Sequence, residues 1–457
     1  MASRPNIIVI LTDQQNFRML SCAGNPYVRT PHLDALAARG VRFENTYCTH
    51  PLCVPSRFSL FTGRMPSEVG QFDNSNEEGK TPRQIVNQGL GHLVKQGGYK
   101  AFYGGKMHFP GYWSPNIGFE HYCNDDRDGL ATAAADKLRQ LATGAEPFLL
   151  VASFINPHDV CYMAVNDFME DTPENRKRKE NIAYASAQTP LEEAMQLPDG
   201  MDEEEFYASV CPPLPDNHEF QPDGPQAKKP TGHRARAAEN WDERRWRMHR
   251  WAYCRLTERV DPQIGQVLDA VQDAGIADHT IIIFTSDHGD NDAAHKLEQK
   301  TEFYDESARV PFIICDPQST RRSAVLPDLV SNGLDLVPTV CDYAGAPLPD
   351  DLRGLSLKPL VRGQARTLPR SFIPVENAAG RMIVTEQYKY AEYDFGANDV
   401  QLNDRTRDPG EMRNAAADPD KQDVVADRRR MLKEWFGSAD NWPGEARFAE
   451  TERSVAH

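Results

Sequence analysis

Residues Asn6 to Asp13 read NIIVILTD. From Ile7 to Leu11 the side chains are all apolar and mostly β-branched, and the run then ends on a threonine and an acid. A short, uninterrupted apolar run of this kind predicts a strand of a parallel sheet that is covered on both faces. We therefore expect the first buried strand here, with Asp13 at its carboxyl end.

Three later segments repeat this pattern. They are KAFYGG at Lys100–Gly105, FLLVASFI at Phe148–Ile155 and TIIIFTS at Thr280–Ser286. Patterns of helical spacing lie between the apolar runs, for example at residues 30–39 and 128–142. The alternation predicts an α/β fold, with a large, mostly parallel central sheet flanked by helices.

Polar side chains follow each of these predicted strands. Lys106 and His108 follow the second, His158 follows the third, and Asp287 and His288 follow the fourth. Ligands of such sheets bind at the carboxyl ends of the strands. The sequence therefore predicts a site in which acids, a lysine and histidines meet at one edge of the sheet.

The remaining chain has three further parts. Residues of about 160–245 are polar and Pro-rich, which indicates a surface excursion near the pocket mouth. A helix is expected from about Trp246 to Ala274, kinked or restarted at Pro262. After a linker near residues 362–367, the runs SFIPVE and RMIVTEQYKYAEY predict a smaller antiparallel subdomain. We expect a catalytic domain over residues 1–365 and a C-terminal subdomain over residues 366–457.

The composition excludes several classes of protein. A net charge of −16 argues against a nucleic-acid partner, which would favour a basic surface. No stretch approaches the ~20 apolar residues of a membrane helix, so no membrane partner is expected. The 9 cysteines are scattered, without a CxxC pair, as is typical of a reducing compartment. We expect a cytoplasmic protein.

A cysteine lies in an unusual context at Pro51–Arg64, which reads PLCVPSRFSLFTGR. Pro55 suits the first turn of a helix and Gly63 suits its end, so Cys53 is expected just before a helix N-terminus. Free backbone N–H groups and the charge of Arg57 would favour an anion there. Alternatives are a buried structural thiol, a disulfide with Cys48, or a thiolate phosphatase, which would need wider Cys–Arg spacing.

The stretch Leu52-Cys53-Val54-Pro55-Ser56-Arg57, followed by LFTGR, closely resembles the signature of type I sulfatases, in the alkaline phosphatase superfamily. LTDQQ, GGKMH, INPHD, SDHGD, QKTEFYDESARVPFII and RDPGEMRN resemble further motifs of that family, in the expected order along roughly the whole chain. The resemblance implies an alkaline-phosphatase-like fold and a sulfuric ester hydrolase. It also implies that Cys53 is oxidised to formylglycine, whose hydrate attacks sulfur with one hydroxyl and expels sulfate with the other.

The resemblance further implies a divalent metal ion. Its ligands would be Asp13, Gln14, oxidised Cys53, Asp287 and His288. Gln14 stands where the family often has a second aspartate, and His288 where asparagine is frequent. Ca²⁺ is the ion that the resemblance implies. Mg²⁺ and Mn²⁺ are the alternatives, since the imidazole ligand at His288 suits transition metals better than Ca²⁺.

Catalytic roles follow from the same resemblance. Lys106 would hold a sulfate oxygen and the oxidised side chain, and His108 would help to deprotonate the geminal diol. His158 would face the leaving oxygen, while Arg57 and Lys300 would neutralise the sulfate. His50, Asp73, Asn74, Asp290 and His295 flank the motifs as weaker candidates.

Sugar sulfates are the expected substrates, ahead of aryl or small alkyl sulfates, and a formylglycine-generating enzyme is the expected maturation partner. One alternative is a phosphonate monoester or phosphodiester hydrolase of the same superfamily. A more remote alternative is a non-catalytic carbohydrate-binding relative.

Overall fold

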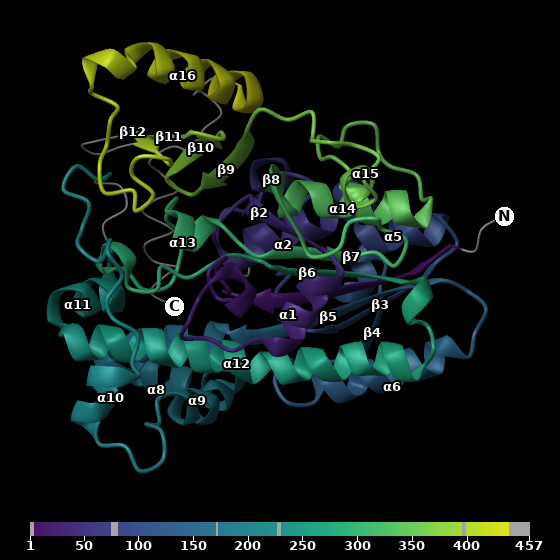
Figure 1. Ribbon diagram of the computed structural model, residues 1–457, viewed down its shortest axis with the longest axis horizontal. Coiled ribbons are helices and arrows are strands. Elements are labelled where there is room, and N and C mark those ends of the chain that lie inside the picture. Colours follow the sequence, from purple (N-terminus) through teal and green to yellow (C-terminus); the bar gives the residue numbers. More distant parts are fainter. Residues whose placement is uncertain (1–3, 75–80, 171, 226–229, 395–398, 438–457) are drawn as a thin grey trace.

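The protein is described here by a computed structural model of residues 4–74, 81–170, 172–225, 230–394 and 399–437. Its larger sheet has the strand order β4-β3-β5-β1-β6-β7-β2-β8 (Figure 1). The strands are β1 Asn6–Asp13, β2 Val41–Tyr47, β3 Lys100–Gly105, β4 Glu120–Cys123, β5 Phe148–Pro157, β6 Thr280–Ser286, β7 Phe312–Cys315 and β8 Ala324–Ser331. Only β7 is antiparallel to its neighbours, β6 and β2. The predicted α/β class with a mostly parallel sheet is confirmed.

Strand β1 lies at the centre of two hydrophobic layers, and all its side chains are buried. Ile7, Val9 and Leu11 face one layer, whereas Ile8 and Ile10 face the other. The first layer contains α2 Cys53–Thr62, α5 Leu90–Gln96 and α14 Asn332–Ala344, and the second contains α1 Pro31–Arg39, α6 Leu130–Ala142 and α12 Glu243–Asp273. Successive strand side chains point to opposite faces, which is why both residue sets must be apolar.

Helix α12 runs without a break along the second layer. It begins after Asp242, whose carboxylate accepts a hydrogen bond from the Arg245 N–H at 2.8 Å, and it continues through Pro262. Pro262 is exposed, so the carbonyl that loses its partner can face water. The predicted helix is confirmed, but it is not restarted at the proline.

The surface excursion is more helical than its composition predicted. It forms α7 Tyr162–Phe168, α8 Pro173–Lys179, α9 Ile182–Ala194, α10 Glu203–Ser209 and α11 Gly232–Asn240. These helices bury Leu191, Phe206 and Ala237 against Trp246 and Trp251 of α12. The excursion therefore has a small apolar core of its own, which holds α11 beside the main sheet.

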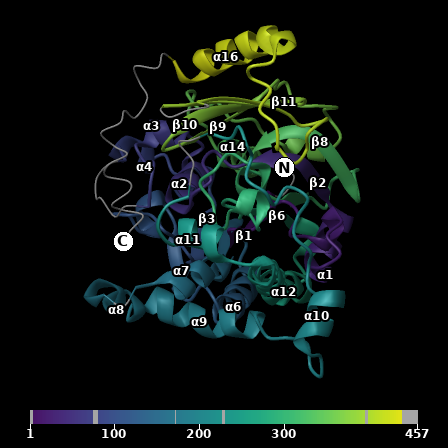
Figure 2. The ribbon, with the colours of Figure 1, turned by 90° about the vertical axis from the view of Figure 1, so that its left-hand side faces the viewer.

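The C-terminal part forms a separate antiparallel sheet of order β12-β11-β10-β9. Its elements are β9 Ile373–Asn377, β10 Gly380–Val384, β11 Tyr388–Tyr393, β12 Val400–Asp404 and α16 Gln422–Phe436. Val425 and Leu432 of α16 cover one face of this sheet, and the other face packs on Tyr47 and Phe303 of the main body (Figure 2). The predicted small antiparallel subdomain is confirmed, while its boundary at residue 365 stays a prediction.

Two expectations concern the cysteines and the membrane. All 9 cysteines are unpaired, and all except Cys22 and Cys123 are buried, while the reducing compartment stays a prediction. Among the described helices, none combines the length and the apolar character that crossing a bilayer requires. The remaining short helices are α3 Pro66–Val69, α4 Arg83–Val86, α13 Asp305–Ala308 and α15 Lys358–Val361.

A buried ion network joins the two sheets. The Lys389 ammonium on β11 donates to Asp305 Oδ1 at 2.9 Å and to the Phe303 carbonyl at 2.6 Å, and it lies 2.6 Å from Glu411 Oε1. Glu411 also accepts the Asp305 N–H at 2.7 Å. Burial opposes the charge on Lys389, but the two carboxylates outweigh it and raise the pKa of the ammonium. Lys389 thus compensates the charge of Glu411 and shares that of Asp305 with Arg309, whose Nη1 lies 3.2 Å from Asp305 Oδ2.

We expect Lys389→Ala to lower the free energy of unfolding by about 3–5 kcal/mol, because it removes the ion-pair partner of the buried Glu411 and leaves Asp305 with Arg309 alone. Lys100→Ala is the control, since Lys100 pairs with Glu146 at the surface, where a salt bridge contributes at most about 1 kcal/mol. Urea unfolding measures both changes. Equal losses in the two variants would contradict the structural role of the network.

Candidate active site

Four strands of the larger sheet deliver polar residues to one edge. Asp13 at the end of β1 pairs in register with Pro157 at the end of β5, and Thr12 pairs with Ser286 at the end of β6. Gly105 at the end of β3 pairs with Ser153. The structure therefore brings Asp13, Lys106, His158 and Asp287 to the same edge, as the strand pattern indicated.

Helix α2 presents residue 53 to this edge. The Ser56 N–H donates to the Leu52 carbonyl at 3.0 Å, so the helix begins at Cys53 itself. The expectation that Cys53 precedes the helix is wrong by one residue, because this bond already closes the first turn. Gly63 ends the helix with φ +70° and donates its N–H to the Ser59 carbonyl at 2.8 Å, as predicted.

Arg57, one turn further along α2, is completely buried beneath residue 53. Its Nε donates to Asp287 Oδ2 at 2.8 Å and its Nη2 to Asp13 Oδ2 at 2.8 Å. Its Nη1 donates to the Lys106 carbonyl at 2.8 Å and to Ser153 Oγ at 2.9 Å. One guanidinium therefore joins α2 to the ends of four strands.

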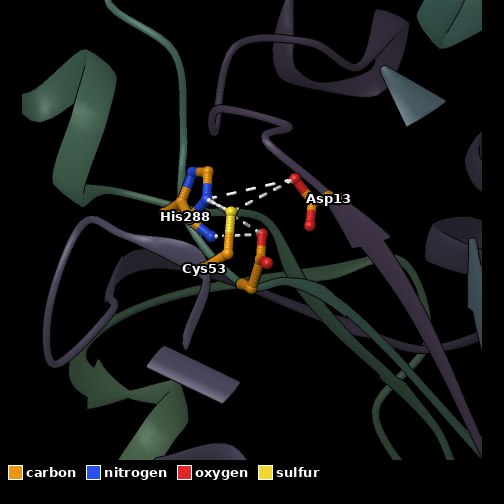
Figure 3. Close-up of side chains that lie close together, drawn as sticks. Asp13, Cys53 and His288 are labelled. Carbon is orange, nitrogen blue, oxygen red and sulfur yellow. Dashed lines mark hydrogen bonds and ion pairs between the residues drawn. The ribbon is translucent and has the colours of Figure 1, made fainter. Parts of the chain in front are cut away.

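The two carboxylates that Arg57 binds belong to a cluster of potential metal ligands, of which Figure 3 labels Asp13, Cys53 and His288. One donor atom each of Asp13, Cys53, Asp287 and His288 lies within 4.8 Å of all the others, and all four residues are buried. The Cys53 sulfur is 3.1 Å from His288 Nε2 and 3.9 Å from Asp13 Oδ1.

The His288 ring is oriented for coordination. Its Nδ1 lies 2.9 Å from the Gly289 carbonyl, which can only accept, so Nδ1 carries a proton and Nε2, 3.1 Å from the Cys53 sulfur, is the nitrogen that faces the cluster and would bind a metal once deprotonated. Two buried carboxylates and one imidazole nitrogen form a ligand set that binds a divalent cation more strongly than a monovalent cation. This part of the site fits a divalent metal ion.

Gln14 is bound to the cluster through its backbone, whose N–H donates to Asp287 Oδ1 at 3.1 Å. Its backbone is left-handed, with φ +68°. Its side-chain oxygen accepts a hydrogen bond from the Lys300 ammonium, and its nitrogen donates to Asp290 Oδ2 at 2.6 Å. Gln14 thus links Lys300 to the metal-ligand cluster, and its expected role as a ligand stays a prediction.

Cations dominate the field at residue 53. The Lys106 ammonium lies 2.6 Å from Asp13 Oδ2 and 4.0 Å from the Cys53 sulfur. Burial and Asp13 both oppose ionisation of the thiol, yet Lys106, Lys300 and His288 hold the pKa of Cys53 well below its usual range. A position that stabilises a thiolate to this degree is suited to another anion.

Two half-buried histidines border the same position. Burial, together with the nearby Lys106, lowers the pKa of His108, which also has a left-handed backbone (φ +52°). Burial and the charges of Lys106 and Lys300 lower the pKa of His158 to about 3. Both rings are therefore neutral near pH 7, when each can donate one proton in a hydrogen bond and accept another.

The weaker candidates occupy different places. Asn74 accepts the Val54 N–H at 3.1 Å and so supports the start of α2, while Asp290 binds Gln14. His295 stacks on Tyr304 at a centroid distance of 3.7 Å, away from the donor cluster. Sequence reasoning missed Ser153, which has no signal within a buried strand, and Arg234, which lies in the polar, Pro-rich segment that the sequence predicts to be a surface excursion.

Comparisons with known proteins agree with this geometry. The family described as Sulfatase matches residues 5–346, and the C-terminal family of N-sulphoglucosamine sulphohydrolase matches residues 293–436. A Delta 4,5-hexuronate-2-O-sulfatase of Bacteroides thetaiotaomicron is 30% identical, over 95% of this chain and 89% of that relative. A choline-sulfatase of Rhizobium meliloti is 27% identical, over 94% and 87%.

Solved structures give the same result. A 2-O GAG sulfatase superimposes with a TM-score of 0.77 and 28% identity, over 95% of this chain and 92% of that chain. The phosphonate monoester hydrolase of Agrobacterium radiobacter has a TM-score of 0.68 and 22% identity, over 94% and 95%, so it shares the fold alone.

We expect Asp13→Asn to weaken binding of a divalent metal by at least about 10²-fold, because it removes a buried anionic ligand. Asp159→Asn is the matched control: this buried acid pairs with Arg127 and lies outside the ligand cluster, so its loss should leave the affinity largely unchanged. Titration calorimetry on metal-stripped protein measures both. Wild-type affinity in Asp13→Asn would show that the cluster is not the metal site.

Proposed function

The chain belongs to the sulfatase family, and from that premise we propose that it hydrolyses sulfate monoesters of sugars, using a formylglycine derived from Cys53 and a bound divalent metal. The observation that carries the proposal is the convergence on residue 53 of buried cations, two histidines and the metal-ligand cluster. A sulfate ester needs all three: charge neutralisation, proton transfer and an activated nucleophile.

The Cys53 sulfur stands in for the oxygens of the oxidised side chain. Once hydrated, that aldehyde supplies one hydroxyl as nucleophile and a second that allows the sulfate to be released. His108 is the proposed base toward this hydroxyl. It is neutral near pH 7 because burial lowers its pKa, so its ring can accept a proton.

Sulfate binding is assigned to the lysines. Lys106 reaches to 4.0 Å from the Cys53 sulfur, and Lys300 acts on the same atom strongly enough to help lower its pKa. Negative charge in the transition state spreads over the sulfate oxygens and the leaving oxygen. Preorganised cations in a buried site act on that charge without reorganisation, which is usually the largest catalytic contribution. Arg57 contributes its charge from beneath.

The metal is proposed to be held by Asp13, Asp287, His288 and oxidised residue 53, with the Gln14 oxygen as a further ligand. It would supply a positive charge beside the nucleophile. Ca²⁺ is the expected ion, with Mg²⁺ and Mn²⁺ behind it, since His288 brings a nitrogen ligand into an otherwise oxygen-rich set.

His158 is assigned to the leaving group. It follows β5 as the first residue after the strand and lies close enough to Cys53 for a side-chain interaction. Its pKa is low in a pocket that holds two ammonium groups. A bound sulfate offsets those charges and raises the pKa of the ring, so that the imidazole can donate a proton to the leaving oxygen.

The substrate class follows from the relatives. Those named above act on a 2-O-sulfated unsaturated hexuronate and on choline sulfate, and a further relative is an N-acetylglucosamine-6-O-sulfatase at 26% identity. We take a 2-O-sulfated hexuronate as the first substrate to test. Maturation requires a formylglycine-generating enzyme, and the unpaired cysteines support a reducing compartment, with the cytoplasm as the proposed location.

The first prediction concerns residue 53. Protein produced with a formylglycine-generating enzyme should show a mass loss of about 18 Da on the peptide that contains Cys53, and only the converted fraction should hydrolyse a sulfate ester. Peptide mass spectrometry and rate measurements on the same samples test this. Cys53→Ala should be inactive, and full activity in that variant would exclude the mechanism.

The second prediction separates leaving-group chemistry from sulfate binding. An activated aryl sulfate leaves as a stable phenolate, whereas a sugar sulfate leaves as a basic alkoxide that needs a proton. His158→Ala should therefore reduce kcat/KM for a sugar sulfate by an extra factor of about 10² relative to an activated aryl sulfate. Lys300→Ala should reduce both to a similar extent, because the charge that it neutralises is common to them.

Equal losses on both substrates in His158→Ala would remove His158 from the general-acid role. A selective loss on the sugar sulfate in Lys300→Ala would likewise contradict its assignment to the sulfate. Matured, metal-replete protein is used throughout, so that all transition states are compared with the same free enzyme.

A further inference from the structure

Helix α11 of the surface excursion contacts the loop that carries Lys300. From this helix, Arg234 donates twice to the Glu298 carbonyl, through Nε at 3.1 Å and Nη2 at 2.8 Å. Its Nη2 also donates to the Glu302 carboxylate at 3.1 Å. A single guanidinium therefore forms hydrogen bonds to the chain on both sides of Lys300.

The loop from Glu298 to Glu302 has an unfavourable backbone conformation. Gln299 and Thr301, which flank Lys300, have φ values of +61° and +99°. Residues other than glycine rarely adopt positive φ values. Such conformations persist only where the surroundings fix them. Within the loop, Asn291 binds the Gln299 carbonyl through its backbone N–H at 2.6 Å. Arg234 supplies hydrogen bonds from a different part of the chain.

Arg234 also contacts two buried acids near Lys300. Glu298 and Glu302 are 1% and 2% exposed. The Arg234 side chain is 10% exposed and lies 3.6 Å from Glu298 Oε1. Burial raises the pKa of Glu298 to about 8 although Arg234 and Lys300 oppose the rise, so Glu302 is the acid whose charge the guanidinium balances. Without Arg234, Glu302 loses this ion pair of 3.1 Å, and the loop that carries Lys300 loses the hydrogen bonds that hold the Glu298 carbonyl.

We propose that Arg234 is a positioning residue for Lys300: it fixes the loop from Glu298 to Glu302 through the Glu298 carbonyl and balances the charge of Glu302, so that the ammonium stays directed at the sulfate. This inference rests on the proposed function. It makes the surface excursion part of the sulfate-binding machinery, in addition to any effect on substrate selection.

A double-mutant cycle tests the coupling. In the wild-type background, Arg234→Gln should lower kcat/KM for an activated aryl sulfate by about 10²-fold, as expected for a displaced binding group. In the Lys300→Ala background, the same substitution should lower it by less than about threefold, because the group that it positions is already absent. The inhibition constant of inorganic sulfate should follow the same pattern.

Arg236→Gln is the matched control on the same helix. Arg236 is exposed and contacts Glu170 and the Phe168 carbonyl, so its loss should leave both kinetic readouts unchanged. Arg234→Lys keeps the buried charge but loses the forked geometry, and it replaces Arg234→Gln in the cycle if the glutamine variant does not fold. It should show an intermediate loss that again disappears without Lys300.

An equal loss from the Arg234 substitution in both backgrounds would overturn the proposal, as would unchanged kinetics in the wild-type background. Failure of the proposed function itself has a different signature, because the matured wild-type protein would then fail to hydrolyse the aryl sulfate at all.

Discussion

The site depends on one buried interaction, in which the Arg57 guanidinium binds Asp13 and Asp287 together. Both acids end neighbouring strands, and burying two carboxylates so close to each other is strongly unfavourable without a cation. The planar, forked donor set of arginine serves both acids and still reaches Ser153 and the Lys106 carbonyl, which a lysine could not do. Arg57 thereby fixes residue 53, one turn earlier on α2, against the strand ends.

Arg234, further from residue 53, also binds two parts of the chain through its guanidinium. Arg234 binds Glu302 and the backbone of Glu298, as Arg57 binds its two aspartates. In both places a guanidinium pairs with a buried acid close to a lysine: Lys106 pairs with Asp13, which Arg57 also binds, and Lys300 lies in the loop that Arg234 contacts. The low pKa of the Cys53 thiol reflects the net result, a buried position with an excess of positive charge.

The sequence predicted the fold where local signals were strong. Apolar β-branched runs identified β1, β5 and β6, and helical spacing identified α1, α6 and α12. It also predicted which residues end these strands, because the carboxyl ends of parallel strands share one edge. The helices of the excursion were missed, since their small core depends on Trp246 and Trp251, far along the chain. Arg234 was missed for the same reason: its partners lie over sixty residues away. The orientation of Gln14 toward Lys300 depends on tertiary contacts that no local pattern encodes.

The central claim is that this positive, metal-binding pocket hydrolyses sulfate esters rather than the phosphonate esters cleaved by a more distant relative of the same fold. The most direct measurement compares kcat/KM of the matured, metal-replete protein for an aryl sulfate and for an aryl phosphonate monoester with the same leaving group. With the leaving group held constant, the ratio reports only how the pocket treats the transferred group. The account predicts that the sulfate is the faster substrate. A faster reaction with the phosphonate would contradict it.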